Sequence, residues 1–203
     1  MFSRFVSNVL YTNRVANPDT IPISKKMPNQ LNELISECGG MSFCNSLYRI
    51  HTLKTSYYWE SLITDYFVNY KNSIIPFGFD WMGRQFAVDI NNSERLLLFD
   101  PATAEDFQLN ENIITFHNET LVDNRLITLA EDDFLDTIKF LKKDIIDFDE
   151  CIGFKKPLFL GGDISKENYE VIDLEVYWTI EAQIYNQLKN LPPGTKINKV
   201  TLE

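Results

Sequence analysis

The chain has 203 residues, of which 44% are hydrophobic and 24% are charged, as in an ordinary globular domain. Its formal net charge of −10 at pH 7 disfavours direct nucleic-acid binding, because phosphates require an excess of Lys and Arg. No apolar run approaches the ~20 residues that cross a bilayer, so we expect no membrane partner. The three cysteines, Cys38, Cys44 and Cys151, are odd in number and form no Cys-x-x-Cys pair, which indicates the reducing cytoplasm.

The first 26 residues differ from the rest of the chain. A short apolar patch is followed by a polar stretch that contains Pro18 and Pro22. This pattern predicts an N-terminal arm with a short helix over 1–26, loosely attached to a single α+β domain over 27–203. The domain begins with a helix predicted over 27–40, with a proline in its first turn and a glycine at its end.

Short apolar runs separated by turns dominate the centre of the chain. Two such runs over 74–90 flank a link that contains Gly83, which predicts a β-hairpin. The apolar run 96–99 predicts a buried strand that ends before Pro101, since proline cannot donate to a sheet ladder. Two further elements are predicted by their periodicity, a strand over 47–53 and an amphipathic helix over 55–68.

The second half of the chain contains two strong helix patterns. Over 131–143, acidic residues crowd the first turn and lysines the last, as the helix dipole favours. Over 174–188, apolar residues recur at i, i+3 and i+4. The weaker predictions are a strand over 152–160, an edge strand over 196–202, and short strands or helical turns over 107–122. Helices mixed with strand hairpins predict an α+β fold, with a mixed or antiparallel sheet flanked by helices.

The sequence offers little for catalysis. It contains two histidines, no Gly-x-Ser-x-Gly elbow and no phosphate-binding loop. Asp80, Asp89 and Asp100 come from neighbouring strand ends, and converging carboxylates hold divalent cations, so a small hydrolase or metal-binding enzyme is an alternative. Against this, Asp80 borders a turn, where aspartate commonly bonds nearby backbone. We expect no catalytic residue, no metal and no cofactor.

Negative charge is concentrated in one quarter of the chain. Residues 100–150 hold 14 acidic and 4 basic residues, whereas the remaining segments are nearly balanced. A cluster of like charges creates a negative electrostatic potential around that part of the protein. It either keeps the protein soluble or attracts a basic partner. In the second interpretation the candidate binding residues are Glu131, Asp132, Asp133, Asp136, Asp144, Asp147, Asp149 and Glu150.

A second candidate lies at the tip of the hairpin. Trp and Arg are the side chains most often found as binding hot spots, and here they are Trp81 and Arg84. Trp81 either folds back onto the core or projects from the turn as an interface anchor.

Five blocks of sequence resemble a known family. They are 77–87 (FGFDWMGRQFA), 98–101 (LFDP), 151–162 (CIGFKKPLFLGG), 173–178 (DLEVYW) and 191–195 (LPPGT). In this order they are similar to bacterial immunity proteins linked to DNase effectors of type VI secretion. Residues 27–50 are similar to the end of the GAD-like region that often precedes the family's C-terminal domain, here apparently short. More distantly, the chain resembles the Smi1/Knr4-like immunity superfamily.

This resemblance implies a Smi1/Knr4-like α+β fold and a non-enzymatic protein that binds and neutralises a cognate secreted toxin effector, a DNase in this family. A nuclease carries a basic groove for phosphates, which an acidic inhibitor can occupy. Two alternatives stay open at this point. One is the enzyme built on the three aspartates, and the other is an acidic scaffold or regulatory module for some other basic protein.

Overall fold

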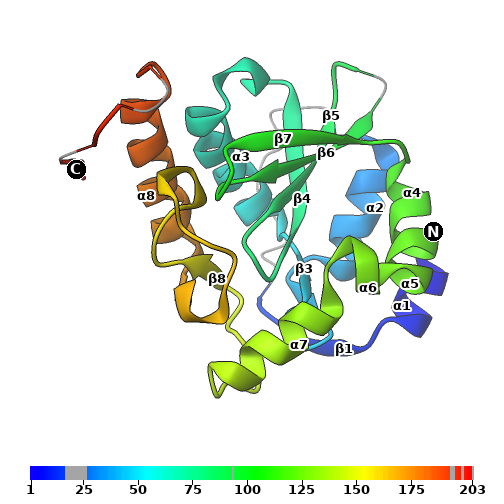
Figure 1. Cartoon of the computed structure of the whole chain (residues 1–203). Coiled ribbons are helices and arrows are strands. Elements are labelled where there is room, and N and C mark those ends of the chain that lie inside the picture. The colour runs from blue at the N-terminus through cyan, green and yellow to red at the C-terminus, as the bar shows by residue number, and fades with distance from the viewer. Residues whose placement is uncertain (17–26, 93, 193–194, 198, 203) are drawn as a thin grey trace.

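The computed structural model describes residues 1–16, 27–92, 94–192, 195–197 and 199–202. At its centre is a seven-stranded antiparallel sheet in which strands adjacent in sequence are adjacent in space (Figure 1). The strands are β1 (Tyr11–Arg14), β2 (Met41–Phe43), β3 (Tyr48–Ile50), β4 (Ile74–Asp80), β5 (Gln85–Asp89), β6 (Arg95–Asp100) and β7 (Glu105–Leu109). A separate hairpin pairs β8 (Glu150–Phe154) with β9 (Tyr169–Asp173). The predicted α+β class, with an antiparallel sheet, a hairpin and flanking helices, is confirmed.

Helices cover both faces of the sheet. We call the two buried clusters the first core, which lies on the face that packs against α1 and α2, and the second core, which lies under α3 and α8. The helices are α1 (Ser3–Asn8), α2 (Asn29–Cys38), α3 (Leu53–Tyr66), α4 (Ile113–Thr115), a π-helix (Phe116–Thr120), α5 (Leu121–Asp123), α6 (Arg125–Thr128), α7 (Glu131–Phe140) and α8 (Leu174–Leu188), with 3₁₀ turns at Val68–Tyr70, Leu158–Leu160 and Lys166–Asn168. The centre of β6, from Leu96 to Phe99, is apolar because Leu96 enters the first core while Leu97 and Phe99 enter the second.

A bulge in β4 divides its side chains between the two cores. The register with β5 shifts between Pro76 and Gly78, which leaves Phe77 as the extra residue. Phe77 therefore lies in the first core, and Phe79 moves to the second. Gly78 lies against Tyr48, and a Cβ atom there would come within 2.6 Å of the Tyr48 hydroxyl oxygen. Only glycine fits at this position.

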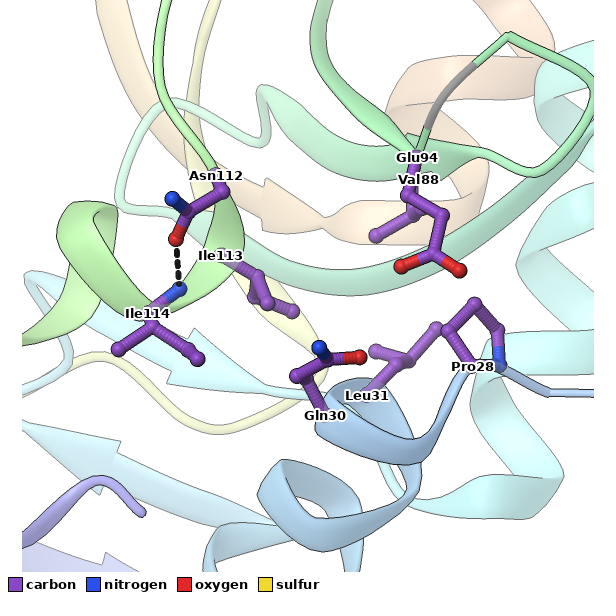
Figure 2. A pocket seen from close by; sticks show the side chains of 8 residues that line it. All are labelled: Pro28, Gln30, Leu31, Val88, Glu94, Asn112, Ile113 and Ile114. Atoms are coloured by element: carbon purple, nitrogen blue, oxygen red, sulfur yellow. Dashed lines mark hydrogen bonds between the residues drawn. The ribbon is translucent and has the colours of Figure 1, made fainter.

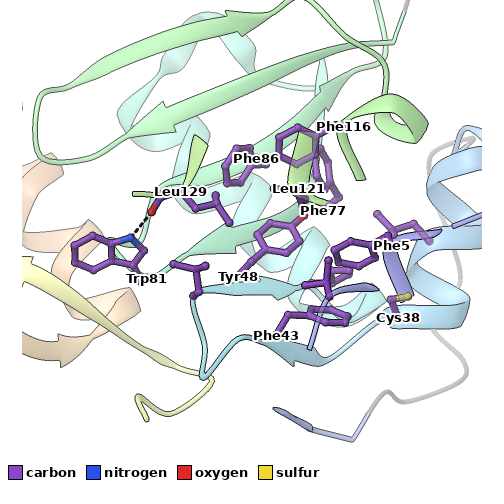
Figure 3. Packing of buried hydrophobic residues seen from close by; sticks show 14 of the residues in the cluster. Phe5, Cys38, Phe43, Tyr48, Phe77, Trp81, Phe86, Phe116, Leu121 and Leu129 are labelled. Carbon is purple, nitrogen blue, oxygen red and sulfur yellow. Dashed lines mark hydrogen bonds between the residues drawn. The ribbon is translucent and has the colours of Figure 1, made fainter. Parts of the chain in front are cut away.

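The N-terminal segment is part of the domain rather than a loose arm. The expected short helix is present as α1, but Phe2 and Phe5 are fully buried in the first core, and Val9 is 6% exposed. Figure 3 shows Phe5 beside Phe43 and Tyr48 in that core. Strand β1 then adds an edge to the main sheet. For residues 1–16 the expectation of a loose arm is wrong, because these aromatic side chains complete the core. The remainder of that arm, 17–26, lies outside the described residues.

Most predicted elements are present with shifted ends. The strand expected over 47–53 stops at Ile50, because Thr52 caps α3 by accepting a hydrogen bond from the Thr55 amide. The ambiguous segment 107–122 is part strand and part helix. The strand expected over 152–160 ends at Phe154.

The edge strand predicted over 196–202 is wrong for the described residues of that range, which form no strand. There the Thr201 carbonyl accepts a hydrogen bond from the side chain of Gln187 on α8 at 2.7 Å, so this backbone is bonded to a helix side chain. No helix among the described residues has the length and apolar character needed to cross a membrane.

Candidate protein-binding surface

Helix α7 turns its acidic residues outward. Phe134, Thr137 and Ile138 are buried, and the 3.6-residue period leaves Asp132, Asp133 and Asp136 exposed. Three acids in the first turn lie at the positive end of the helix dipole, which stabilises them there. The backbone just before α7 is anchored to the first core. There the buried Trp81 indole nitrogen donates a hydrogen bond to the Leu129 carbonyl oxygen at 2.7 Å.

The segment 144–150, between α7 and β8, carries the other predicted acids. Asp144, Asp147 and Asp149 are exposed, while Ile146 between them is fully buried. The Ser46 hydroxyl donates to the Ile146 carbonyl oxygen at 2.7 Å, and the Glu150 carboxylate accepts from the Asp147 amide at 3.1 Å. The buried Ile146 and these bonds hold the backbone that carries the exposed carboxylates.

A buried arginine anchors this segment from inside the protein. Arg49 on β3 has no exposed surface, and its Nη1 donates to the Asp147 carbonyl oxygen at 2.9 Å and to the Glu150 carbonyl oxygen. Its Nη2 donates to the Asp80 carbonyl oxygen at 2.9 Å, and the guanidinium carbon lies 4.4 Å from the Phe79 ring centroid. Burial lowers the pKa of Arg49 to about 10, so it remains charged at neutral pH.

Sequence reasoning missed Arg49. The available signal is its place in the apolar alternation of Tyr48, Arg49 and Ile50, where a charged residue requires internal partners.

We use the name acidic surface for the exposed carboxylates of α7 and of the segment 144–150, together with two half-buried ones. Its exposed members are Asp132, Asp133, Asp136, Asp144, Asp147 and Asp149, and its half-buried members are Glu131 and Glu150. Two of the eight form ion pairs, Glu131 with Arg125 at 2.8 Å and Asp136 with Lys166 at 3.2 Å. The structure thus places all eight predicted acids on two consecutive segments.

The tip of the hairpin is not a binding anchor. Trp81 is only 1% exposed, and its ring lies inside the first core (Figure 3). It packs against Phe134 with ring centroids 5.6 Å apart. Its predicted role as an exposed anchor is therefore wrong, because the ring folds back beneath α7. Arg84 keeps a side chain that is 20% exposed, but its Nε donates to the Asp80 carboxylate at 2.6 Å. That ion pair compensates the charge of Arg84.

The three aspartates proposed for an enzyme do not form one site. Asp80 and Asp100 lie at the same end of the sheet, whereas Asp89 is at the other end of β5, where it pairs with Arg95 at 3.2 Å. Asp80 bonds the Met82 and Arg84 amides, and Asp100 bonds the Ala102 amide at 2.9 Å. Among the described residues no group of three His, Cys, Asp or Glu is placed to hold a metal ion. The three carboxylates therefore do not converge as the enzyme alternative requires, and they bond the backbone of local turns.

Both histidines have structural partners. The His117 Nδ1 lies 2.7 Å from the Ile113 carbonyl oxygen, to which it donates, so its Nε2 accepts from the Tyr48 hydroxyl at 3.0 Å. The His51 Nε2 lies 2.8 Å from the Gln85 side-chain oxygen. Burial lowers the pKa of each histidine to about 4, so both rings are neutral near pH 7.

Helix α8 carries a carboxylate that enters the second core. Glu181 is 1% exposed, and its Oε2 has no hydrogen-bond partner among the described residues. Burial, with a smaller contribution from the nearby Asp100 carboxylate, raises the pKa of Glu181 to about 8. The Tyr177 hydroxyl one turn earlier is likewise buried without a partner in the described part of the chain. Because both groups are buried, we expect them to influence the stability of the fold.

A hollow of about 220 Å³ lies between the start of α2 and the start of α4 (Figure 2). Leu31, Val88 and Ile113 form its apolar walls, and Glu94 is its one ionisable lining residue among those described. The Asn112 side chain at its edge is bonded to the Ile114 amide at 3.0 Å, where it caps α4. A single carboxylate supplies no acid–base pair, so we do not take this hollow as the functional site.

The molecule thus defines an α+β protein whose antiparallel sheet is covered on both faces. It is similar to the crystal structure of Atu4351 from Agrobacterium tumefaciens, with a TM-score of 0.61 and 14% sequence identity. The likeness covers 90% of this chain and 89% of that chain. At this identity it shows the fold alone. No protein-family model matches the sequence, and no curated protein matches it.

Proposed function

We propose that this protein is a non-enzymatic immunity protein that acts in the cytoplasm. It binds a cognate secreted toxin effector, a nuclease, and neutralises it by covering the basic groove that holds nucleic acid. The observation that carries this proposal is the acidic surface, whose six exposed carboxylates are held by two neighbouring segments. The resemblance of the sequence to type VI secretion immunity proteins and to the Smi1/Knr4-like superfamily supports the same conclusion.

The electrostatics of the acidic surface fit such a partner. Residues 131–150 contain eight acids and three lysines, so the segment is strongly negative even with Lys139, Lys142 and Lys143 among the acids. A nuclease groove is positive wherever it holds phosphates. Opposite potentials accelerate encounter more than they strengthen the final complex. A stable complex requires about 800 Å² buried on each partner, so apolar contacts must supplement the carboxylates.

Charge reversal on α7 tests this proposal. We expect the triple variant Asp132→Lys, Asp133→Lys, Asp136→Lys to associate with the cognate effector at least about 10-fold more slowly at low salt. Its association rate should also depend less on ionic strength, because the screened attraction is gone. Stopped-flow mixing over a salt series measures both quantities.

The matched control changes the net charge equally at other exposed sites, through Glu37→Lys, Asp65→Lys and Glu119→Lys. This control should retain most of the association rate of the natural protein and most of its dependence on ionic strength. Equal rates and equal salt dependence for the α7 variant and the natural protein would contradict docking through the acidic surface.

Co-expression with the neighbouring gene product separates this function from a general acidic scaffold. An immunity protein captures that effector. Recovery of other basic proteins instead of the effector would favour a scaffold or regulatory module.

A further inference from the structure

A second hollow adjoins the acidic surface. It has a volume of about 210 Å³ and lies between α3, the end of the segment 144–150 and the first turn of α8. Its lining combines aromatic rings with carboxylates. The rings are those of Trp59, Phe79 and Phe148, and the carboxylates are those of Asp149, Asp173 and Glu175.

The aromatic rings form a firm floor. Trp59 and Phe79 are 6% and 1% exposed, so each is fixed by the second core. Phe148 meets Phe79 edge to face, with ring centroids 5.3 Å apart. Trp59 in turn packs edge to face against Trp178, at 5.8 Å. These rings stay in place without a guest, so a bound side chain would meet a preorganised surface.

The carboxylates at the rim are exposed, and each belongs to a different structural context. Asp173 caps α8 by accepting from the Val176 amide at 2.8 Å, and Glu175 accepts from the Tyr58 hydroxyl. The Asp149 carboxylate makes no hydrogen bond to the described residues, although its backbone carbonyl accepts from the Leu174 amide at 2.7 Å. No Lys or Arg lines the described part of this hollow.

Arg49 contacts the floor from the interior of the protein. Its guanidinium stacks on Phe79, but its hydrogen bonds are directed to backbone carbonyl oxygens rather than to the carboxylates at the rim. The carboxylates of Asp149, Asp173 and Glu175 therefore retain acceptor capacity on their solvent side. The rings left for a guest are those of Trp59 and Phe148.

We propose that this aromatic pocket receives one arginine side chain of the protein partner. A guanidinium stacks on aromatic faces and forms directed hydrogen bonds with carboxylates, which matches a floor of rings and a rim of acids. A lysine ammonium would satisfy the charge but not the stacking. The inference rests on the proposed function, since it names the group that the acidic surface draws in. The pocket would bind one particular side chain of the partner, whereas the acidic surface attracts its positive charge as a whole.

Binding of a minimal probe tests the pocket without any effector. We expect N-acetyl-arginine methylamide to shift the NMR signal of the Trp59 indole in a saturable manner and to leave that of the buried Trp81 unchanged. The uncharged isostere N-acetyl-citrulline methylamide should shift neither signal. The triple variant Asp149→Asn, Asp173→Asn, Glu175→Gln should weaken probe binding at least 10-fold, and asparagine still caps α8.

Two further variants make the test specific. Phe148→Leu should weaken probe binding several-fold by removing a ring. Glu119→Gln, which neutralises an exposed acid outside both the pocket and the acidic surface, should leave probe binding unchanged. Equal shifts with the citrulline compound, or unchanged binding by the triple variant, would overturn the inference.

The outcomes with the effector remain distinguishable. If pocket variants bind the effector normally while the α7 variant does not, the pocket inference fails and the proposed function stands. If the arginine probe binds and the effector does not, toxin neutralisation fails and the pocket stands.

Discussion

Arg49→Met is expected to lower the free energy of unfolding by about 3–5 kcal/mol, because it removes several charge-assisted hydrogen bonds that are each worth roughly 1.5–3 kcal/mol. Methionine preserves much of the side-chain volume but donates no hydrogen bond. The carbonyl oxygens of Asp80, Asp147 and Glu150 would each lose a buried donor. Replacing a buried ion pair by apolar residues is often tolerated, but here the partners are backbone atoms that cannot be replaced.

The loss should be local as well as global. Because Arg49 joins β3 to the segment 144–150, amide hydrogen exchange should accelerate at Glu150 and Leu174, whose amides bond the Asp147 and Asp149 carbonyls. Urea unfolding and exchange measurements test both effects. The control is Arg4→Met, which removes an exposed arginine bonded to Asp123 at 2.8 Å and should change stability little. A similarly small effect for Arg49→Met would show that the arginine is not an anchor.

Glu181→Gln is expected to remove a loss of stability that the Glu181 carboxyl group causes in the natural protein as pH rises from about 5 to about 8. Burial raises the folded-state pKa of Glu181 to about 8, well above its ordinary value of 4.5. Between these two values the folded protein retains a proton that the unfolded chain has released. The contribution of Glu181 to stability therefore falls as pH rises through this window and levels off above pH 8.

The glutamine side chain does not ionise, so its contribution to stability does not change with pH. The free energy of unfolding of the variant should therefore increase relative to that of the natural protein as pH rises from about 5 to about 8. The difference should approach roughly 3–5 kcal/mol at pH 8, from about 1.4 kcal/mol for each unit of pKa shift. The two buried histidines destabilise both proteins alike below pH 6.5, because their pKa values are lowered to about 4. Denaturant unfolding at pH 5, 6.5 and 8 measures the difference. If the free energies of unfolding of the two proteins differ by the same amount at all three pH values, the pKa of Glu181 in the folded state is not raised.

The sequence predicted long periodic elements better than short ones. Helix α8 begins and ends where its apolar stripe does, at Leu174 and Leu188, and the β4–β5 hairpin follows from two apolar runs. Strands β1 and β2 were missed because three or four residues carry too little periodicity. Their pairing is set by tertiary contacts, among them the burial of Phe43 against Phe5 at a ring centroid distance of 4.7 Å.

The sequence predicted which acidic residues form the acidic surface, but it did not predict how distant segments come together beside that surface. The acids of α7 are exposed as their helical period requires, since Phe134 and Ile138 mark the buried face. Trp81 was placed at a turn correctly, but the sequence did not settle whether its ring points inward. The second hollow was not predicted, because Trp59, Phe148 and Glu175 come from three distant segments. Only the folded chain brings them together.

In the proposed function, this protein neutralises a basic nuclease by occupying its groove and performs no chemistry itself. The most direct test is a titration of the neighbouring effector's nuclease activity with the purified protein. The account predicts that activity falls linearly and is abolished near one equivalent. Full nuclease activity in several-fold excess of the protein, or inactivation by a small fraction of an equivalent, would contradict it.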